Sequence, residues 1–167
     1  WVGLNIRKNK KTMTITGYTN ATTVTATVNE TLTNTTATAD WDEQSMSDLR
    51  GYPQAVTFHN NRLWFGGLFS RPASVLASKI SEYTNFDVDV AASSDAIDLD
   101  ISGDQVNEVR HMISGKDLQV FTDGGEYYVP TANDNTITPS NVAVKKQTPY
   151  GISRTAPKMF DQATGFV

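Results

Sequence analysis

Short runs of alternating apolar and polar residues cover most of the chain, and turn-forming residues separate them. The runs are rich in Thr, Val, Ile, Tyr, Phe and Trp, and the separators are Gly, Asn, Asp and Pro. This usage is typical of strands joined by tight turns. Nowhere do apolar residues recur with the i, i+3, i+4 spacing of an amphipathic helix. The pattern therefore predicts an all-β protein with at most a short helical turn.

Residues 1–39 are predicted to form a small antiparallel β module. Its strands are expected at residues 4–7, 12–18 and 22–28. The apolar residues of the last two strands are expected to share one buried face: Met13, Ile15, Val24, Ala26 and Val28. The many threonines of this region also leave an O-glycosylated stalk open, although stalks usually carry proline and lack such alternation.

Residues 40–54 are predicted to connect this module to the rest of the chain. Acidic residues surround Trp41, and Gly51-Tyr52-Pro53 is a turn that precedes the next strand. We expect Trp41 to fill a gap in the packing rather than to bind a ligand.

Residues 55–167 are predicted to contain a repeated four-stranded unit. The first unit has strands expected at 55–58, 63–66, 74–80 and 95–101, and the second at 106–113, 118–122, 126–129 and 142–145. The strongest hairpin signal is Asn60-Asn61, because asparagine tolerates the left-handed backbone of a tight turn. A third unit is expected to begin at 157–160.

The repeat distance predicts the architecture. Leu63 and Leu118 follow corresponding hairpin turns 55 residues apart, close to the spacing of four-stranded β-propeller blades. Two blades and the start of a third cannot close a propeller, which needs at least four. The expected fold is a partial β-propeller preceded by the small β module. The start at Trp1 and the strand-like end at Phe166-Val167 fit an excerpt of a longer protein.

Composition excludes several classes of site. The chain has 18 acidic and 14 basic residues and a net charge of −4, whereas proteins that grip nucleic acid usually have a basic excess. It has no cysteine and only two histidines, which excludes disulfide scaffolds, cysteine–zinc sites and histidine-rich metal sites. No apolar run is long enough to cross a membrane, so no membrane insertion by this segment is expected.

An acidic run raises the hypothesis of a calcium site. Its members are Asp87, Asp89, Asp95, Asp98, Asp100 and Asp104. Calcium needs several oxygen atoms that converge on one point, and the spacing does not fit an EF-hand loop. The favoured interpretation is a solvated strand face that carries Asp98 and Asp100 and discourages edge pairing. If this face lined a channel, its charge would keep DNA from adhering.

No set of residues in the sequence fits a known catalytic arrangement well. Asp123-Gly124-Gly125-Glu126 holds two carboxylates, but they flank a predicted hairpin turn instead of facing each other across a cleft as in a glycosidase. No G-x-S-x-G elbow is present. His59 is expected in a turn and His111 in a strand, and neither has a visible partner. We therefore predict no enzyme activity, no catalytic residue, no metal and no cofactor.

The run Arg62-Leu63-Trp64-Phe65-Gly66-Gly67 has two interpretations. Trp64 could be a stacking platform for a ligand, or Trp64 or Phe65 could pack between blades, which is the favoured prediction. The predicted motif and core residues are Trp64, Phe65, Gly66, Gly67, Asp123, Gly124 and Gly125.

Several of these motifs, in this order, resemble the tail nozzle proteins (tail tubular protein B) of short-tailed bacteriophages. The resemblance covers roughly residues 51–167. It rests on Gly51–Gly67, Arg71–Ser78, Tyr83–Phe86, Asp95–Leu99, Leu118–Glu126 and Gln147–Gly151. Residues 1–39 are similar, more weakly, to the small β module that often precedes this segment.

The resemblance implies a structural protein of the virion tail, present in the host cytoplasm during assembly. Nozzle proteins form a homo-hexameric ring below the portal and adaptor, contact tail fibre proteins, carry propeller-like domains and form the exit channel for phage DNA. They are much longer than this chain, so ring-forming and gate elements would lie outside it.

Irregular polar loops at residues 68–71, 82–87 and 131–140 are the expected contact regions. The candidate interface residues are Arg62, Leu68, Phe69, Arg71, Tyr83 and Asn85. A carbohydrate-binding propeller module that recognises a receptor is the alternative function, with Trp64, Tyr127 and Tyr128 as candidate aromatics. A propeller glycosidase is a third class, without a candidate constellation.

Overall fold

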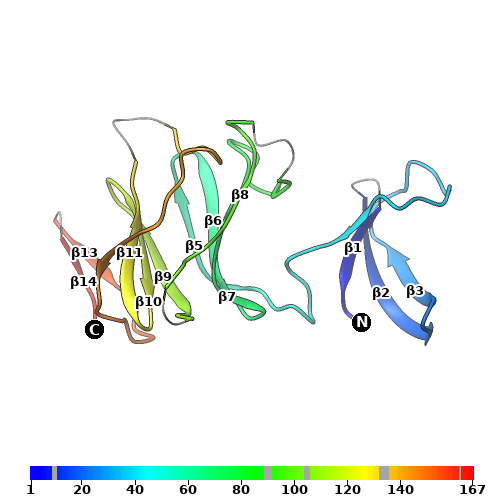
Figure 1. The fold of residues 1–167 in the computed structure, drawn as a ribbon, viewed down its shortest axis with the longest axis horizontal. Coiled ribbons are helices and arrows are strands. Elements are labelled where there is room, and N and C mark those ends of the chain that lie inside the picture. The colour runs from blue at the N-terminus through cyan, green and yellow to red at the C-terminus, as the bar shows by residue number, and fades with distance from the viewer. Residues whose placement is uncertain (9–10, 89–91, 104–105, 132–135, 162) are drawn as a thin grey trace. The chain divides into compact units, whose positions relative to one another are not determined.

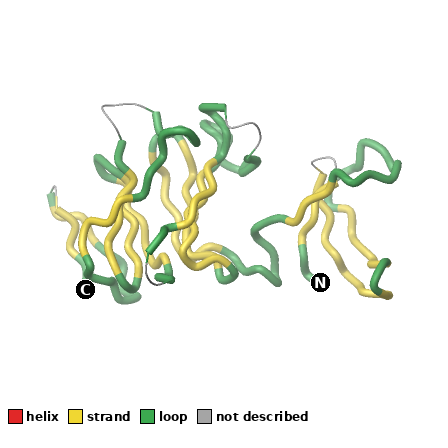
Figure 2. Tube along the Cα trace, in the orientation of Figure 1, coloured by secondary structure: helices red, strands yellow, loops and turns green. Residues whose placement is uncertain are grey.

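The computed structural model describes residues 1–8, 11–88, 92–103, 106–131, 136–161 and 163–167 (Figure 1). These residues form strands, turns and loops and contain no helix (Figure 2), which confirms the all-β prediction. Accordingly, no helix among them could span a membrane. The chain divides into two compact units, Trp1–Tyr52 and Pro53–Val167.

The first unit is a four-stranded antiparallel sheet with the order β3-β2-β1-β4. Its strands are β1 (Asn5–Lys8), β2 (Lys11–Asn20), β3 (Thr23–Val28) and β4 (Trp41–Glu43). The predicted hairpin is present, with Ile15 opposite Ala26. The predicted connector is wrong in part, because β4 lies within it and pairs with β1. The boundary between the units falls after Tyr52, near the end of the predicted connector.

The burial expected for this hairpin is only partly correct. Ile15 is buried, but Val24 and Val28 are 39% and 49% exposed, since the described strands of this unit all belong to one sheet. Trp41 lies on the edge strand β4 and is 59% exposed. It therefore does not fill a gap in the packing of the first unit, and that prediction is wrong.

The second unit begins with a four-stranded antiparallel meander whose strands are neighbours in chain order. They are β5 (Pro53–His59), β6 (Arg62–Leu68), β7 (Arg71–Ala77) and β8 (Ile97–Asp100). Asn60 and Asn61 join β5 to β6 with φ angles of 49° and 56°. Two successive left-handed residues make a turn whose twist suits a hairpin, so the strongest local prediction is confirmed.

A second meander with the same strand order follows. Its strands are β9 (Val109–Ser114), β10 (Leu118–Thr122), β11 (Gly125–Val129) and β12 (Lys145–Thr148). The fourth strand begins three residues later than predicted, because Val142 and Val144 precede it and pack against the core. The predicted third repeat begins with a hairpin of β13 (Lys158–Phe160) and β14 (Ala163–Gly165).

The two meanders pack face to face, and β5 lies beside β9. A single apolar core joins them, formed by Ala55, Trp64, Val75, Ala77, Ile97, Ile101, Val109, Met112, Leu118, Val120, Tyr127, Val129 and Ile137. Alternation along β10 sends Leu118 and Val120 into this core and Gln119 and Phe121 to the opposite face.

The β13–β14 hairpin and the residues that follow it cover this opposite face. Phe166 lies with its ring centroid 5.1 Å from that of Phe121, and the Thr164 hydroxyl donates to Gln119 Oε1 at 2.6 Å. Figure 1 shows the hairpin beside this sheet. The unit is therefore a stack of consecutive antiparallel sheets, each covering a face of the next.

Candidate functional site

Arg62 is fully buried, and it holds four chain segments together. Its Nη1 donates to the carbonyl oxygens of Ser78 and Asp95, each at 2.6 Å, and its Nη2 donates to that of Ser93 at 2.9 Å. Its Nε donates to the carbonyl oxygen of Ile137 at 3.1 Å, across to the second meander. Burial lowers the pKa of the guanidinium, while the nearby charge of Asp95 opposes that shift.

Arg62 is therefore not an interface residue, and that prediction is wrong. The guanidinium has donors in a fixed fork, which suits it to satisfy backbone carbonyls that the chain has turned inward. The sequence places Arg62 beside a turn, where an arginine is usually solvated. The loops that bury it come from residues 16 to 75 positions away.

The motif Trp64-Phe65-Gly66-Gly67 forms the contact between the two meanders. Trp64 is fully buried in the shared core, and its Nε1 donates to the carbonyl oxygen of His59 at 3.0 Å. A Cβ at Gly66 would lie 2.8 Å from Cγ1 of Val109. Gly67 has φ +68°, and a Cβ there would overlap the carbonyl oxygen of Val109. The glycines thus let β6 approach β9, and the packing role of Trp64 is confirmed.

Of the other predicted interface residues, one is buried and four remain accessible. Leu68 is fully buried, so its assignment to an interface is wrong. Phe69 is 81% exposed at the tip of the β6–β7 turn, and Tyr83 is also exposed. Asn85 and Arg71 are partly exposed, and Arg71 is held by Asp98.

An apolar surface covers the face of the first meander that points away from the shared core. We call it the outer face and define it by Val56, Phe58, Phe65, Tyr83 and Phe86. Val56 and Phe58 are 60% and 61% exposed on β5. Phe58 meets Tyr83 edge-on at 5.1 Å between ring centroids, and Phe65 stacks on Phe86 at 5.0 Å. Large exposed side chains grouped in this way mark a contact surface.

The described aspartates of the acidic run do not converge. Asp98 and Asp100 project from the edge strand β8 and pair with Arg71, at 2.7 and 3.0 Å. Asp95 is buried, pairs with Lys79 and accepts from the backbone of Ala92. The prediction that Asp98 and Asp100 lie on the solvated face of an edge strand is confirmed.

No group of three potential metal ligands occurs among the described residues, and nothing there supports the calcium hypothesis. Asp89 and Asp104 lie outside the described residues.

The carboxylates of Asp123 and Glu126 have separate structural roles. Asp123 Oδ1 accepts from the backbone N–H of Glu108 at 2.8 Å, and buried Glu126 accepts from the hydroxyl of Thr148 at 3.1 Å. Across the turn, the Thr122 hydroxyl donates to the carbonyl oxygen of Gly125 at 2.7 Å. The prediction that this segment is a hairpin turn is confirmed.

His59 has partners that its sequence neighbourhood does not show. Its side chain is buried at the end of β5, with Nδ1 2.9 Å from Ser114 Oγ and Nε2 3.1 Å from Thr131 Oγ1. Burial lowers the pKa of the imidazole, and the Asp117 charge opposes this shift. His111 lies in β9 as predicted, and its Nε2 is 3.3 Å from the carbonyl oxygen of Arg154.

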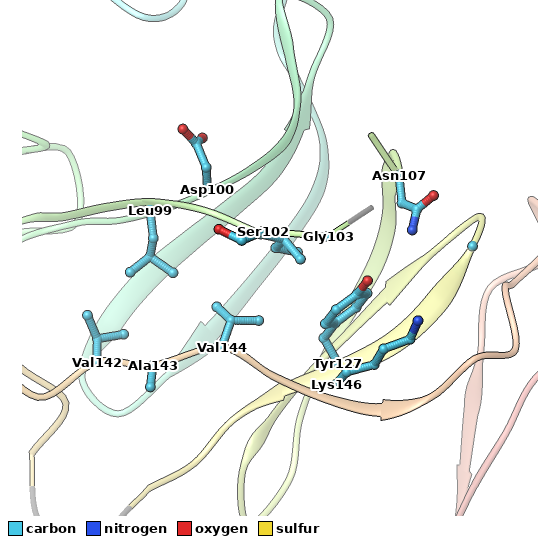
Figure 3. A pocket seen from close by; sticks show the side chains of 12 residues that line it. Leu99, Asp100, Ser102, Gly103, Asn107, Tyr127, Val142, Ala143, Val144 and Lys146 are labelled. Atoms are coloured by element: carbon cyan, nitrogen blue, oxygen red, sulfur yellow. The ribbon is translucent and has the colours of Figure 1, made fainter. Parts of the chain in front are cut away.

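A cleft of about 550 Å³ opens between the two meanders, where β8 ends and the chain approaches β12 (Figure 3). Leu99, Val142 and Val144 form its apolar wall. In Figure 3 the polar ends of Asn107, Tyr127 and Lys146 gather at the other end. The sequence singled out Tyr127 as a candidate carbohydrate-binding aromatic, but only the tertiary structure brings it together with Asn107 and Lys146.

Comparison with known proteins adds no assignment: no family model matches the chain, and no curated protein matches it.

Proposed function

We propose that this chain is a structural segment of a short-tailed bacteriophage tail, belonging to the nozzle subunit around the DNA exit channel. The observation that carries the proposal is the consecutive stacking of two equivalent four-stranded meanders and a third hairpin. Propeller blades are consecutive four-stranded sheets of this kind. The meanders span the same residues as the motifs that resemble nozzle proteins.

The face-to-face packing supports the propeller interpretation in a second way. The first strands of the two meanders, β5 and β9, lie beside each other. Their fourth strands, β8 and β12, are at the opposite edges of the two sheets. First strands on one side and fourth strands on the other are what radially arranged blades would have.

The outer face supports a role in assembly. Val56 and Phe58 remain exposed although the opposite face of the same sheet is buried in the core. A sheet that is apolar on both faces is typical of one covered on both sides. In the proposed tail, a further blade, a neighbouring subunit or an adaptor or fibre protein covers this face.

In this proposal the acidic strand β8 does not line the channel. It lies at the edge of its sheet away from β5, and Arg71 offsets the charges of Asp98 and Asp100. The net charge of −4 is nevertheless compatible with a protein past which DNA slides without being bound.

The test is to locate the protein in virions of the phage that encodes it. Immunogold labelling with an antibody raised against residues 53–167 should place gold at the end of the tail below the portal. Label on the capsid, or virions without label whose tails are complete, would contradict the proposal.

A variant pair tests the assembly role of the outer face. Phage carrying Phe58→Ser should yield fewer complete tails in electron micrographs, because a polar residue there weakens the apolar contact. Phage carrying Val106→Ser, which changes an exposed valine away from the outer face, should assemble normally.

A further inference from the structure

We propose that the cleft between the two meanders binds an acidic saccharide, with Lys146 pairing with a sugar carboxylate. The proposal goes beyond the tail role and does not depend on it. The volume of about 550 Å³ lies within the range of about 300–1,000 Å³ typical of small-molecule sites.

The polar groups of the cleft are available to a ligand. Within the described part of the chain, no hydrogen bond or ion pair engages the side chains of Ser102, Asn107, Tyr127 or Lys146. They supply a hydroxyl, an amide, a phenol and an ammonium, which together can donate to and accept from several sugar hydroxyls. Unengaged polar groups at an apolar cleft are typical of a binding site.

The backbone fixes the positions of three of these groups. Tyr127 and Lys146 are directly opposite each other on β11 and β12, so their side chains lie on the same face of the sheet. Asn107 lies against the β10–β11 turn, where a Cβ at Gly124 would overlap its side chain. A site positioned by strands loses little entropy when it binds.

The charge of the cleft favours an anionic ligand. Among the described residues that line the cleft, Lys146 is the cation without an ion-pair partner. Asp100, the carboxylate among them, already pairs with Arg71 and accepts from the hydroxyl of Ser74. Figure 3 shows the Asp100 carboxylate directed away from Leu99 and Val144. Among the described lining residues, a ligand carboxylate beside Lys146 would therefore meet a cation with no carboxylate partner of its own, while the charge of Asp100 is offset by Arg71.

The mixture of groups favours a saccharide over an acidic peptide. Leu99, Val142 and Val144 are partly exposed and can receive the apolar C–H face of a sugar ring. A peptide with several carboxylates would find only one unpaired cation among the described lining residues, whereas neutral donors and acceptors predominate.

The experiment is a calorimetric titration of the 167-residue chain with trigalacturonate, with maltotriose as the neutral ligand of matched size. Trigalacturonate should bind at least ten-fold more tightly than maltotriose. The affinity should fall at least ten-fold in Lys146→Gln and be largely restored in Lys146→Arg. Lys145→Gln is the matched control, since it removes the same charge one residue away on the other face of β12, and it should change the affinity less than two-fold.

A two-dimensional amide NMR titration of the same protein locates the site independently. Trigalacturonate should shift the amide signals of Asn107, Tyr127 and Val144. Absence of binding at millimolar trigalacturonate, equal losses in the two glutamine variants, or equally tight binding of triglutamate would each overturn the proposal. None of these outcomes would affect the tail proposal, which virion labelling tests.

Discussion

Arg62 shows how one side chain can hold loops that are distant in sequence. Its guanidinium serves the carbonyl oxygens of four residues, and three of them belong to the loop region between β7 and β8. Without a donor, each of these carbonyls would be an unsatisfied polar group inside the unit. The stability of this end of the first meander therefore depends on a polar residue as well as on its apolar core.

Replacing Arg62 with methionine tests this role. Each buried acceptor left without a donor costs about 1–3 kcal/mol, so we expect the free energy of unfolding to fall by at least about 3 kcal/mol. Urea unfolding followed by tryptophan fluorescence measures the change.

The matched control is Arg71→Met, which removes a partly exposed arginine with two ion pairs. Exposed pairs contribute up to about 1 kcal/mol, so the control should unfold nearly as the parent does. Equal losses in the two variants would contradict the role assigned to Arg62.

His59 gives the stability of the second unit a predictable dependence on pH. Because burial lowers the pKa of His59 from its usual 6.5, the unfolded chain binds this proton more readily than the folded chain does. The contribution of neutral His59 is complete above the unfolded pKa and is lost as the pH falls toward the folded pKa.

Urea unfolding at several pH values between 7.5 and 5 tests this expectation against His59→Gln, which does not titrate. The free energy of unfolding of the parent should fall more steeply with decreasing pH than that of the variant. Parallel slopes for the parent and His59→Gln would refute the expectation.

At the scale of elements, the strands were predicted well where local chemistry decides them. The Asn60-Asn61 turn, the alternation in β10 and the Thr122-to-Gly125 hairpin connection all depend on neighbouring residues, and all are present. β4 was missed because it has only three residues, of which Asp42 and Glu43 are acidic, and such a segment carries little strand signal. Their pairing with β1 joins segments more than 30 residues apart.

The close contact between β6 and β9 predicts that adding one methyl group at Gly67 will destabilise the protein. Gly67→Ala must hold a Cβ at φ +68° and against the carbonyl oxygen of Val109. Such backbone strain costs about 1–3 kcal/mol, and the overlap adds to it. We expect thermal and urea unfolding to report a loss of about 2 kcal/mol or more.

Gly115→Ala is the control for this substitution. Its Cβ would meet Cε of Met159 at an ordinary 3.5 Å, so the expected change is within about 1 kcal/mol. If Gly67→Ala were as stable as Gly115→Ala, the close approach of β6 to β9 would not be a feature of the folded protein.

At the scale of the whole molecule, the division into two units predicts independent folding. The 115 residues of Pro53–Val167 contain the whole apolar core of the stacked meanders. We expect the fragment 53–167 to fold alone. Its amide NMR signals should overlay those of the same residues in the full chain, except near residue 53. Amide signals of narrow chemical-shift dispersion, as an unfolded chain gives, would show that Trp1–Tyr52 is needed for folding.

The sequence by itself determined the all-β class, the presence of two consecutive four-stranded units, their hairpin turns at Asn60-Asn61 and Asp123-Gly124, and the packing role of Trp64. These follow from the two-residue period of strands and from the backbone freedom of asparagine and glycine, which act over a few residues. Only the tertiary structure decided that Arg62 and Leu68 are buried and that His59 has two hydroxyl partners. It also decided that Lys146 shares a cleft with Asn107 and Leu99. The physical reason is that burial, pairing and pKa depend on which distant segments cover a side chain, and alternation along a strand does not specify what packs on either face.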